Sequence, residues 1–157
     1  MDIKVRKAEH ADLERVNLLR RQVNDVHVAG RPDIFRAGFC DEMRDRLYKV
    51  FEDDGFDVIV SETDGIICGF AVIEYAVKPL SPYNNERKIF RIEEFGVDEA
   101  CRRQGVASAM IDYLKGYARE QGYNKIELDV WEFNRPAVSF YEKVGFEPYR
   151  RYLEMNL

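Results

Sequence analysis

The chain contains few cysteines, and their spacing excludes two common uses of this residue. Its 157 residues include three of them, Cys40, Cys68 and Cys101. An odd number of scattered cysteines does not make a paired disulfide framework, and no two of them have the short spacing of metal ligands. We therefore expect reduced thiols in a cytoplasmic protein, and no metal site.

Long apolar runs and blocks of basic residues are absent as well. No run approaches the roughly 20 apolar residues that cross a membrane, and the first four residues lack the pattern of a signal peptide. A formal net charge of −5 argues against a general nucleic-acid binder. These absences predict a soluble protein that binds neither membranes nor nucleic acid.

What the chain does contain is typical of one folded domain over residues 1–157. Hydrophobic residues make up 46% of it and aromatic residues 13%, which is enough for a packed core. A chain of this length buries roughly two thirds of its unfolded surface on folding. The sequence has no linker, repeat or low-complexity segment, so we expect a single domain.

Hydrophobic periodicity and turn residues predict the order of the elements. Strands are predicted near residues 3–5, 58–60, 66–75, 89–97, 125–130 and 149–155. Helices are predicted near residues 8–22, 41–51, 106–121 and 134–144. Residues 24–39 are predicted to form a non-helical segment between the first and second helices. Asp64-Gly65 is predicted to form a hairpin turn. This alternation predicts a mixed α/β sheet domain.

Residues 102–107, with the sequence Arg-Arg-Gln-Gly-Val-Ala, are the most informative stretch. They follow a predicted strand and begin an amphipathic helix, and a helix N-terminus presents free backbone N–H groups to an anion. Gly105 allows the backbone to approach a ligand closely, and Arg102 and Arg103 add positive charge. The alternative from these residues alone is an ordinary helix start with two solvated arginines.

Three separated segments form a pattern in this sequence. The first is Phe95-Gly96-Val97-Asp98, followed by Arg102-x-x-Gly105-x-Ala107. The second is Asp129-Val130 followed by Asn134 and Ala137, and the third is residues 140–146 (Phe-Tyr-Glu-Lys-Val-Gly-Phe). In their order and spacing the three segments resemble the GCN5-related N-acetyltransferases, and the first is similar to the cofactor signature of that family, although Ala107 stands where many relatives have glycine.

The resemblance implies a fold and a co-substrate. The fold would be a mixed, mostly antiparallel sheet of six to seven strands, flanked by about four helices, with a splayed central pair of strands. Acetyl-CoA would be the co-substrate, and the acetyl group would pass to a primary amine by direct attack in a ternary complex. The acceptor would be a protein N-terminus, a peptide or a small molecule.

The resemblance also assigns residues to the cofactor. Its pyrophosphate would lie against the turn made by Arg102, Arg103, Gln104, Gly105, Val106 and Ala107. The pantetheine arm would lie along Phe95, Gly96 and Val97, with the N–H of Val97 stabilising the oxyanion at the thioester carbonyl. Asn134 would bond the pantetheine arm, serve as a helix N-cap, or do both.

Proton transfer requires an acid and a base, and the sequence offers candidates for each. Tyr141 matches the general acid of the family, and a phenol can protonate a departing thiolate. Asp129, Glu93 and Glu94 are candidates for the base, directly or through water. Because side chains alternate along a strand, at most one of the two glutamates is expected to face the thioester.

The acceptor site is less specific in the sequence. The amine is expected to enter between the early helices and the loop at residues 79–85, with residues 22–56 and 77–87 shaping the pocket. His27 could contact substrate or act as a base, although a lone histidine is more often structural. Cys101 lies near the anion turn, which could lower its pKa, yet no step requires it.

Three alternative classes of protein can be compared with this sequence by their motifs. A non-catalytic acyl-CoA-binding or sensing module would keep the anion turn without productive chemistry. A P-loop protein is excluded because Gly105 is not followed by Lys-Ser or Lys-Thr, and a Rossmann protein lacks its glycine-rich turn after the first strand. Pairing of the last strand across a homodimer stays open.

Overall fold

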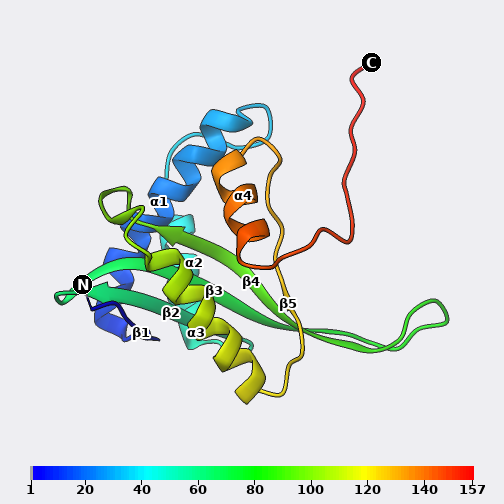
Figure 1. Cartoon of the computed structure of the whole chain (residues 1–157). Coiled ribbons are helices and arrows are strands. Elements are labelled where there is room, and N and C mark those ends of the chain that lie inside the picture. Colours follow the sequence, from blue (N-terminus) through cyan, green and yellow to red (C-terminus); the bar gives the residue numbers. More distant parts are fainter. Residues whose placement is uncertain (1) are drawn as a thin grey trace.

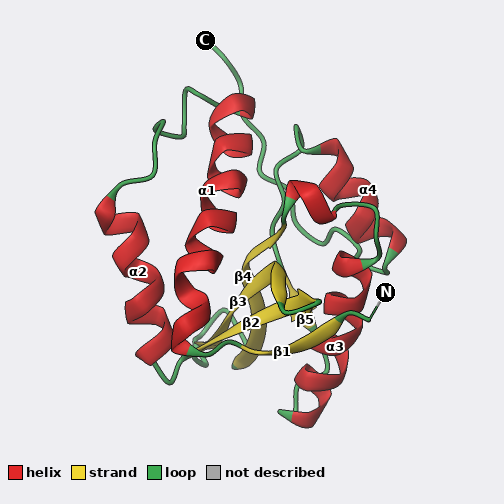
Figure 2. Cartoon of the chain, turned by 90° about the vertical axis from the view of Figure 1, so that its left-hand side faces the viewer, coloured by secondary structure: helices red, strands yellow, loops and turns green. Residues whose placement is uncertain are grey.

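The computed structural model describes residues 2–157 and places one sheet between two layers of helices (Figure 1). Helices α1 and α2 cover one face of the sheet, and α3 and α4 lie on the other side (Figure 2). In chain order the elements are β1 (Lys4–Lys7), η1 (His10–Asp12), α1 (Leu13–Gly30), α2 (Asp41–Glu52), β2 (Phe56–Thr63), β3 (Ile66–Lys78), β4 (Arg87–Val97), η2 (Glu99–Cys101), α3 (Val106–Glu120), β5 (Ile126–Glu127) and α4 (Arg135–Lys143).

The sheet is mostly antiparallel, as expected. Its strands follow the order β1-β2-β3-β4-β5, with β1 to β4 antiparallel and β5 parallel to β4. The hairpin turn between β2 and β3 has Asp64 at φ 52° and Gly65 at φ 77°. Two consecutive residues with positive φ suit the right-handed twist of the strands, so the Asp-Gly signal is confirmed.

Two apolar cores hold the layers together, one on each face of the sheet. On the α3 face, Met110, Ile111 and Leu114 are fully buried against Ile73 and Phe90. On the other face α1 and α2 bury Leu13, Val16, Leu19 and Leu47 against strand residues that include Val60 of β2 and Phe70 of β3. Each side chain of this size stabilises the fold by about 1.5–3 kcal/mol when buried.

The first helix is longer than its hydrophobic spacing predicts. α1 continues to Gly30, so the break expected from residue 24 onwards begins only after that glycine. The second half of α1 borders a cavity through Val23, His27 and Gly30, and of these three Val23 also packs against the buried core. The fully buried residues of α1 all lie in its first half, so the apolar stripe weakens after it and periodicity underestimates the length of the helix.

The strand count also differs from the expectation. Within the described residues the sheet has five strands instead of six or seven. The strand expected at residues 125–130 keeps only Ile126 and Glu127, and the alternating residues 149–155 form no strand. Both segments have strand-like sequences, but a strand is assigned only where its backbone pairs with a neighbour.

Two segments project from the body of the molecule at the side of β5. One is the end of the β3–β4 hairpin, and the other is the C-terminal segment, residues 147–157 (Figure 1). Among the described residues, no helix combines the length and the apolarity needed to cross a membrane.

Candidate active site

The parallel strands β4 and β5 separate after a short contact. They pair only at Phe90–Ile126 and Arg91–Glu127, while β4 continues to Val97. Asp98 donates its N–H to the carbonyl oxygen of Cys68 on β3, at 2.8 Å. Since successive N–H groups of a strand point to opposite sides, the N–H of Val97 points away from β3 and toward the gap. The splayed pair that the sequence predicted is therefore present, at the edge of the sheet.

Gly96 lies where neighbouring side chains approach the backbone of β4. It pairs with Phe70 on β3, and a Cβ at this position would lie 2.6 Å from Val23 Cγ2 and 2.7 Å from Phe70 Cε1. Glycine therefore avoids a clash at this position. β4 also has a bulge, which lies at Glu93 because the register passes from Ile73–Ile92 directly to Val72–Glu94.

This bulge overturns the expectation that Glu93 and Glu94 occupy opposite faces. One extra residue resets the alternation of side chains along a strand. Glu93 forms an ion pair with Arg46 of α2, and Glu94 forms one with Arg20 of α1. Both carboxylates therefore lie on the face that α1 and α2 cover, and both line the same cavity.

That cavity lies between α1, β4, α4 and the segment that follows β5. Its volume is about 720 Å³, within the ~300–1,000 Å³ usual for small-molecule sites. Of the residues assigned to a site from the sequence, it is lined by Glu93, Glu94, Phe95, Gly96, Val97, Arg102, Asp129, Asn134 and Tyr141.

The anion turn begins beside this cavity and continues onto the surface. Arg103 (φ 60°) and Gly105 (φ 85°) have left-handed backbone conformations, and such residues in a turn make a concave group of N–H donors. Within residues 2–157, the N–H groups of residues 103–108 donate to no protein acceptor. Arg102 and Arg103 form no ion pair in that same range. The turn is therefore available to an anion, although only Arg102 also lines the cavity.

The two glutamates of β4 differ in how fully their oxygens are bound. Glu94 accepts from Arg20 at both oxygens, at 2.8 and 3.0 Å, and Arg20 also donates to Asn17 and to the carbonyl oxygen of Met43. Glu93 binds Arg46 through Oε1, while its buried Oε2 has no partner in the described part of the chain. Glu93 therefore keeps one oxygen without a protein donor, whereas both oxygens of Glu94 are bound.

Asp129 and Tyr141 stand on the opposite wall. The side chain of Asp129 is 80% exposed and accepts from Arg91 at 3.0 Å. Tyr141 packs among Phe95, Phe140 and Phe146, and its hydroxyl has no hydrogen-bond partner among the described residues. Burial, and to a smaller extent the charge of Asp129, raises the pKa of Tyr141 to about 12. The phenol therefore keeps its proton at neutral pH.

Asn134 caps α4 and keeps a free donor. Its Oδ1 accepts from the N–H of Ala137 at 3.3 Å, so the expected N-cap is confirmed. Within the described chain its side-chain NH₂ donates to nothing. The same side chain can therefore cap the helix and donate into the cavity.

The family follows from comparison with known proteins. Residues 22–146 match the model of the acetyltransferase (GNAT) family. The chain belongs to this family.

Individual relatives support the assignment. N-acetyltransferase 8 of Homo sapiens is 26% identical over 108 residues, which are 69% of this chain and 46% of that protein. The acetyltransferase chain thus spans about half the length of the curated relatives that it matches. A mutant BH1408 protein from Bacillus halodurans, a solved structure, is 30% identical with a TM-score of 0.92, and the match covers 98% of this chain and 99% of that one.

A further solved structure supports the fold alone. AAC(6')-Iy in complex with the bisubstrate analog CoA-S-monomethyl-acetylneamine has a TM-score of 0.77 and 18% identity, and the match covers 100% of this chain and 99% of that chain. The acyl-CoA N-acyltransferase fold expected from the sequence is confirmed, with the reduced strand count described above.

The sequence singled out His27 but not the aromatic side chains that pack around it at the site. His27 stacks on Phe35 with ring centroids 4.9 Å apart, and Phe35 contacts Trp131 at 5.1 Å. Phe133 lies against Gly30, where a Cβ would be only 2.1 Å from its ring. Burial lowers the pKa of His27, against the smaller opposing effects of Glu94 and Asp129. The only trace of this aromatic wall in the sequence is Gly30, whose missing side chain makes room for Phe133. The two residues are about 100 positions apart, so a single sequence does not show that they are in contact.

Two smaller expectations are wrong. Contact with Cys68, followed by burial, raises the pKa of Cys101 to about 11, so the anion turn does not lower it. The loop at residues 79–85 lies at the tip of the β3–β4 hairpin and does not line the cavity, nor does any other residue from 77 to 87. Residues 22–56 do contribute to the cavity, through α1, Phe39 and Met43.

Proposed function

We propose that residues 1–157 form a single acetyltransferase domain that transfers an acetyl group from acetyl-CoA to a primary amine. One observation carries the proposal. The free edge of β4, the anion turn, an unsatisfied carboxylate oxygen and a protonated phenol all border one cavity or its rim. A binding protein needs the first two of these features, whereas a transferase needs all four.

The donor half of the site would hold acetyl-CoA through the backbone. The free N–H groups after Arg102 suit the pyrophosphate, and the positive charges of Arg102 and Arg103 strengthen that attraction. The edge of β4 at Phe95 and Val97 suits the amide groups of the pantetheine arm. The N–H of Val97, which points into the gap, would donate to the thioester carbonyl oxygen.

The acceptor half would manage the protons. A protonated amine must lose a proton before its nitrogen can attack the carbonyl carbon. Glu93 is the base that we favour, directly or through water, because Oε2 is free while both oxygens of Glu94 are bound to Arg20. Asp129 is the second choice because its side chain is largely exposed. As the C–N bond forms and the C–S bond breaks, Tyr141 would donate its proton to the departing sulfur.

The acceptor that suits these walls is a cation with an apolar part. Glu93, Glu94 and Asp129 supply negative charge, and Phe133 and Trp131 supply apolar surface. A small-molecule amine or a peptide N-terminus fits that description. The three free thiols suit a reducing compartment, and we propose a cytoplasmic location.

The experiment that tests this function combines binding with turnover. Acetyl-CoA is titrated by calorimetry, and the protein is then assayed for CoA release with a panel of amino acids, polyamines, amino sugars and peptides. Binding together with release that depends on one amine class supports the transferase. Binding without release from any amine would favour the acyl-CoA-sensing alternative, and absence of binding would overturn both.

A further inference from the structure

Four aromatic side chains pack against one another at the end of α1. We call them the aromatic cluster: His27, Phe35, Trp131 and Phe133. Each ring contacts two others, with centroid distances of 4.9 Å (His27–Phe35), 5.1 Å (Phe35–Trp131), 6.1 Å (Trp131–Phe133) and 6.3 Å (Phe133–His27). His27, Trp131 and Phe133 line the cavity. The aromatic cluster therefore joins α1 to the segment after β5 and presents ring surface to the acceptor half of the site.

Gly30 fixes the position of one of these rings. A Cβ at this position would lie 2.1, 2.2 and 2.5 Å from three ring carbons of Phe133. The ring thus rests directly on the backbone of α1, and no side chain larger than a hydrogen atom fits between them. The shape of this part of the cavity depends on the absence of a side chain at residue 30.

The aromatic cluster lies within electrostatic reach of two carboxylates of the cavity. Burial lowers the pKa of His27, and the negative charges of Glu94 and Asp129 act in the opposite direction. With a lowered pKa the imidazole is neutral at pH 7 and does not repel a cation. One small molecule can therefore place an ammonium group near the carboxylates and an attached ring on the aromatic cluster.

A carboxylate on the acceptor would find no free cation in the acceptor half. Among the described residues, the arginines that line the cavity are Arg20 and Arg102. Arg102 belongs to the anion turn of the donor half. All three guanidinium nitrogens of Arg20 already donate to protein acceptors, which are Glu94, Asn17 and the carbonyl oxygen of Met43. A negative charge beside the amine would thus be buried without a partner, which is costly.

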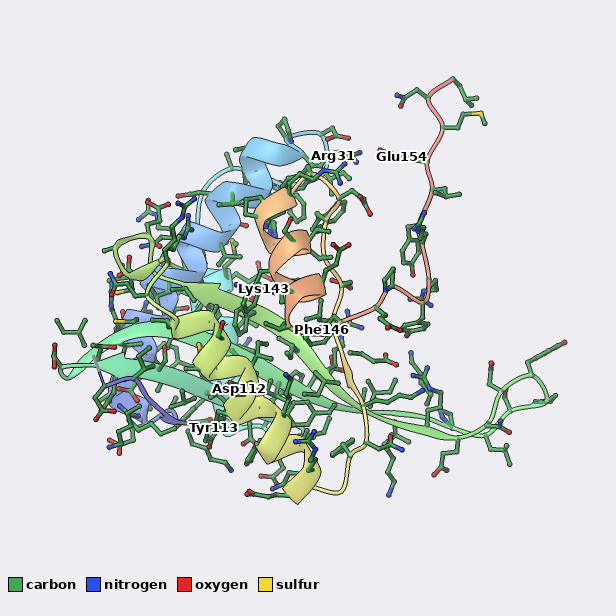
Figure 3. The ribbon with its side chains drawn as sticks, in the orientation of Figure 1. Arg31, Asp112, Tyr113, Lys143, Phe146 and Glu154 are labelled. Atoms are coloured by element: carbon green, nitrogen blue, oxygen red, sulfur yellow. The ribbon has the colours of Figure 1, made fainter. Side chains whose placement is uncertain are left out.

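The arginines just outside the cavity are paired as well. Arg31, which follows the last residue of α1, forms ion pairs with Asp33 and Glu154 (Figure 3). Arg46 and Arg91 are paired with carboxylates of the cavity wall itself. The charges of this half therefore suit an acceptor that brings a positive charge and no negative one.

We propose that the acceptor is a primary amine joined by a short chain to an aromatic ring, with no carboxylate beside the nitrogen. This inference rests on the proposed transfer to a primary amine and narrows the acceptor of that reaction. The ammonium group would lie near the carboxylates of β4, and the ring would pack on Trp131 and Phe133 in stacked or edge contacts. Phe133, held in place by Gly30, is then a specificity-determining residue.

Four related amines separate the contribution of the ring from that of the charge. The value of kcat/KM is measured with 2-phenylethylamine, ethylamine, phenylalanine and phenylalanine amide at saturating acetyl-CoA. We expect 2-phenylethylamine to exceed ethylamine at least about 100-fold, since a single methylene in an apolar pocket is worth about 10- to 200-fold. Phenylalanine should be at least about 100-fold poorer than 2-phenylethylamine, because its carboxylate has no partner. Phenylalanine amide has the same size without the charge, and should stay within about tenfold of 2-phenylethylamine.

A matched pair of glycine variants tests the role of Phe133. Gly30→Ala adds a methyl group where the ring lies, so the preference for 2-phenylethylamine over ethylamine should fall at least about tenfold, chiefly through KM. Gly116→Ala adds the same group to α3, where no neighbouring atom lies within 4 Å, and should leave the preference unchanged. Phe133→Leu keeps an apolar side chain without the ring and should lower the preference in the same direction, which provides a second test if Gly30→Ala does not fold.

Binding distinguishes failure of this inference from failure of the proposed transfer. Calorimetry measures 2-phenylethylamine and phenylalanine with the protein saturated with CoA. Tighter binding of 2-phenylethylamine, without turnover of any amine, would support the amine site and overturn the transfer. Turnover of ethylamine or phenylalanine at the same kcat/KM as 2-phenylethylamine would overturn the inference and leave the transfer standing. The inference is also overturned if 2-phenylethylamine does not bind, or if Gly30→Ala and Phe133→Leu both keep the preference of the parent protein.

Discussion

The two halves of the cavity are built from different parts of the chain. The donor half consists of backbone: the free edge of β4 and the turn with Arg103 and Gly105 at positive φ. The acceptor half consists of side chains from α1, α2, the bulge of β4 and the segment after β5. A backbone site depends on a short continuous motif, whereas a side-chain site depends on residues brought together by packing.

This difference explains why one half is readable in a single sequence. A glycine at a helix start is a local requirement, and local requirements leave local motifs. The contact of Gly30 with Phe133 and the ion pair of Arg20 with Glu94 join residues many positions apart. These contacts therefore leave no short motif in the sequence. Since the two halves are built separately, we expect substitutions in the donor half to weaken cofactor binding and substitutions in the acceptor half to slow turnover.

The largest effect is expected in the acceptor half, for Glu93→Gln. The amide keeps the shape of the side chain and its contact with Arg46 but cannot accept the amine proton. We expect kcat to fall about 100- to 1,000-fold, within the range of general-base catalysis, with the Kd for CoA unchanged by calorimetry. Steady-state kinetics with the best amine gives the answer.

Glu94→Gln is the matched control for that change. It leaves the buried guanidinium of Arg20 without its carboxylate, and should lower the free energy of unfolding by about 1–3 kcal/mol with a smaller loss of kcat. If Asp129→Asn abolishes turnover while Glu93→Gln does not, the base lies on the other wall.

The next effect is expected in the donor half, for Gly105→Val. A β-branched residue at φ 85° is strained, so the turn should relax and withdraw its N–H groups. A strain of about 1–3 kcal/mol corresponds to a roughly 5- to 150-fold weaker Kd for CoA. Gly65→Val imposes similar strain at φ 77° in the β2–β3 turn and should lower stability without changing this Kd. Equal affinities of the two variants would exclude the turn from the binding site.

Tyr141→Phe tests the proposed general acid, which would lie where the donor and acceptor halves meet. Loss of the proton donor should lower kcat at least about tenfold and leave acetyl-CoA affinity nearly unchanged. Since the pKa of Tyr141 is raised to about 12, the phenol stays protonated below that pH. The rate of the parent enzyme should therefore show no loss from this group between pH 6 and 10, and a kcat profile checks this. Unchanged turnover in the variant would contradict the acid role.

The smallest effect is expected for Asp98→Asn, which weakens the connection between the halves. Asp98 accepts from the N–H of Ala100 and from Gln22 and binds Arg15 of α1. Burial raises its pKa, but these three partners together lower it below the ordinary value. A lowered pKa in the folded state means stability that is present above the unfolded value and lost as the pH falls.

The variant should thus be less stable by about 1 kcal/mol at pH 7, measured by urea unfolding. The difference should shrink as the pH falls below 3.8, the ordinary pKa of an aspartate in an unfolded chain. A difference that stays constant with pH would show that the carboxylate charge is not its source.

Several residues show how far the sequence could be read. The Asp64-Gly65 turn, the buried stripe of α3 and the Asn134 cap were all predictable, because each depends on neighbours within a few positions. The face of the sheet on which Glu93 lies was not predictable, because a bulge in β4 places Glu93 on the same face as Glu94. The length of α1 was not predictable either, because its second half borders a cavity and has no fully buried side chain.

By itself, then, the sequence determined the family, the order of the elements and the turn that suits a phosphate. These features follow from local backbone preferences and from the periodicity of apolar residues. Only the tertiary structure decided which carboxylate keeps a free oxygen, which aromatic rings form a wall and that residues 149–155 are left unpaired. Those outcomes depend on packing between distant segments, and pairing of a strand depends on a neighbour that the strand's own residues do not specify.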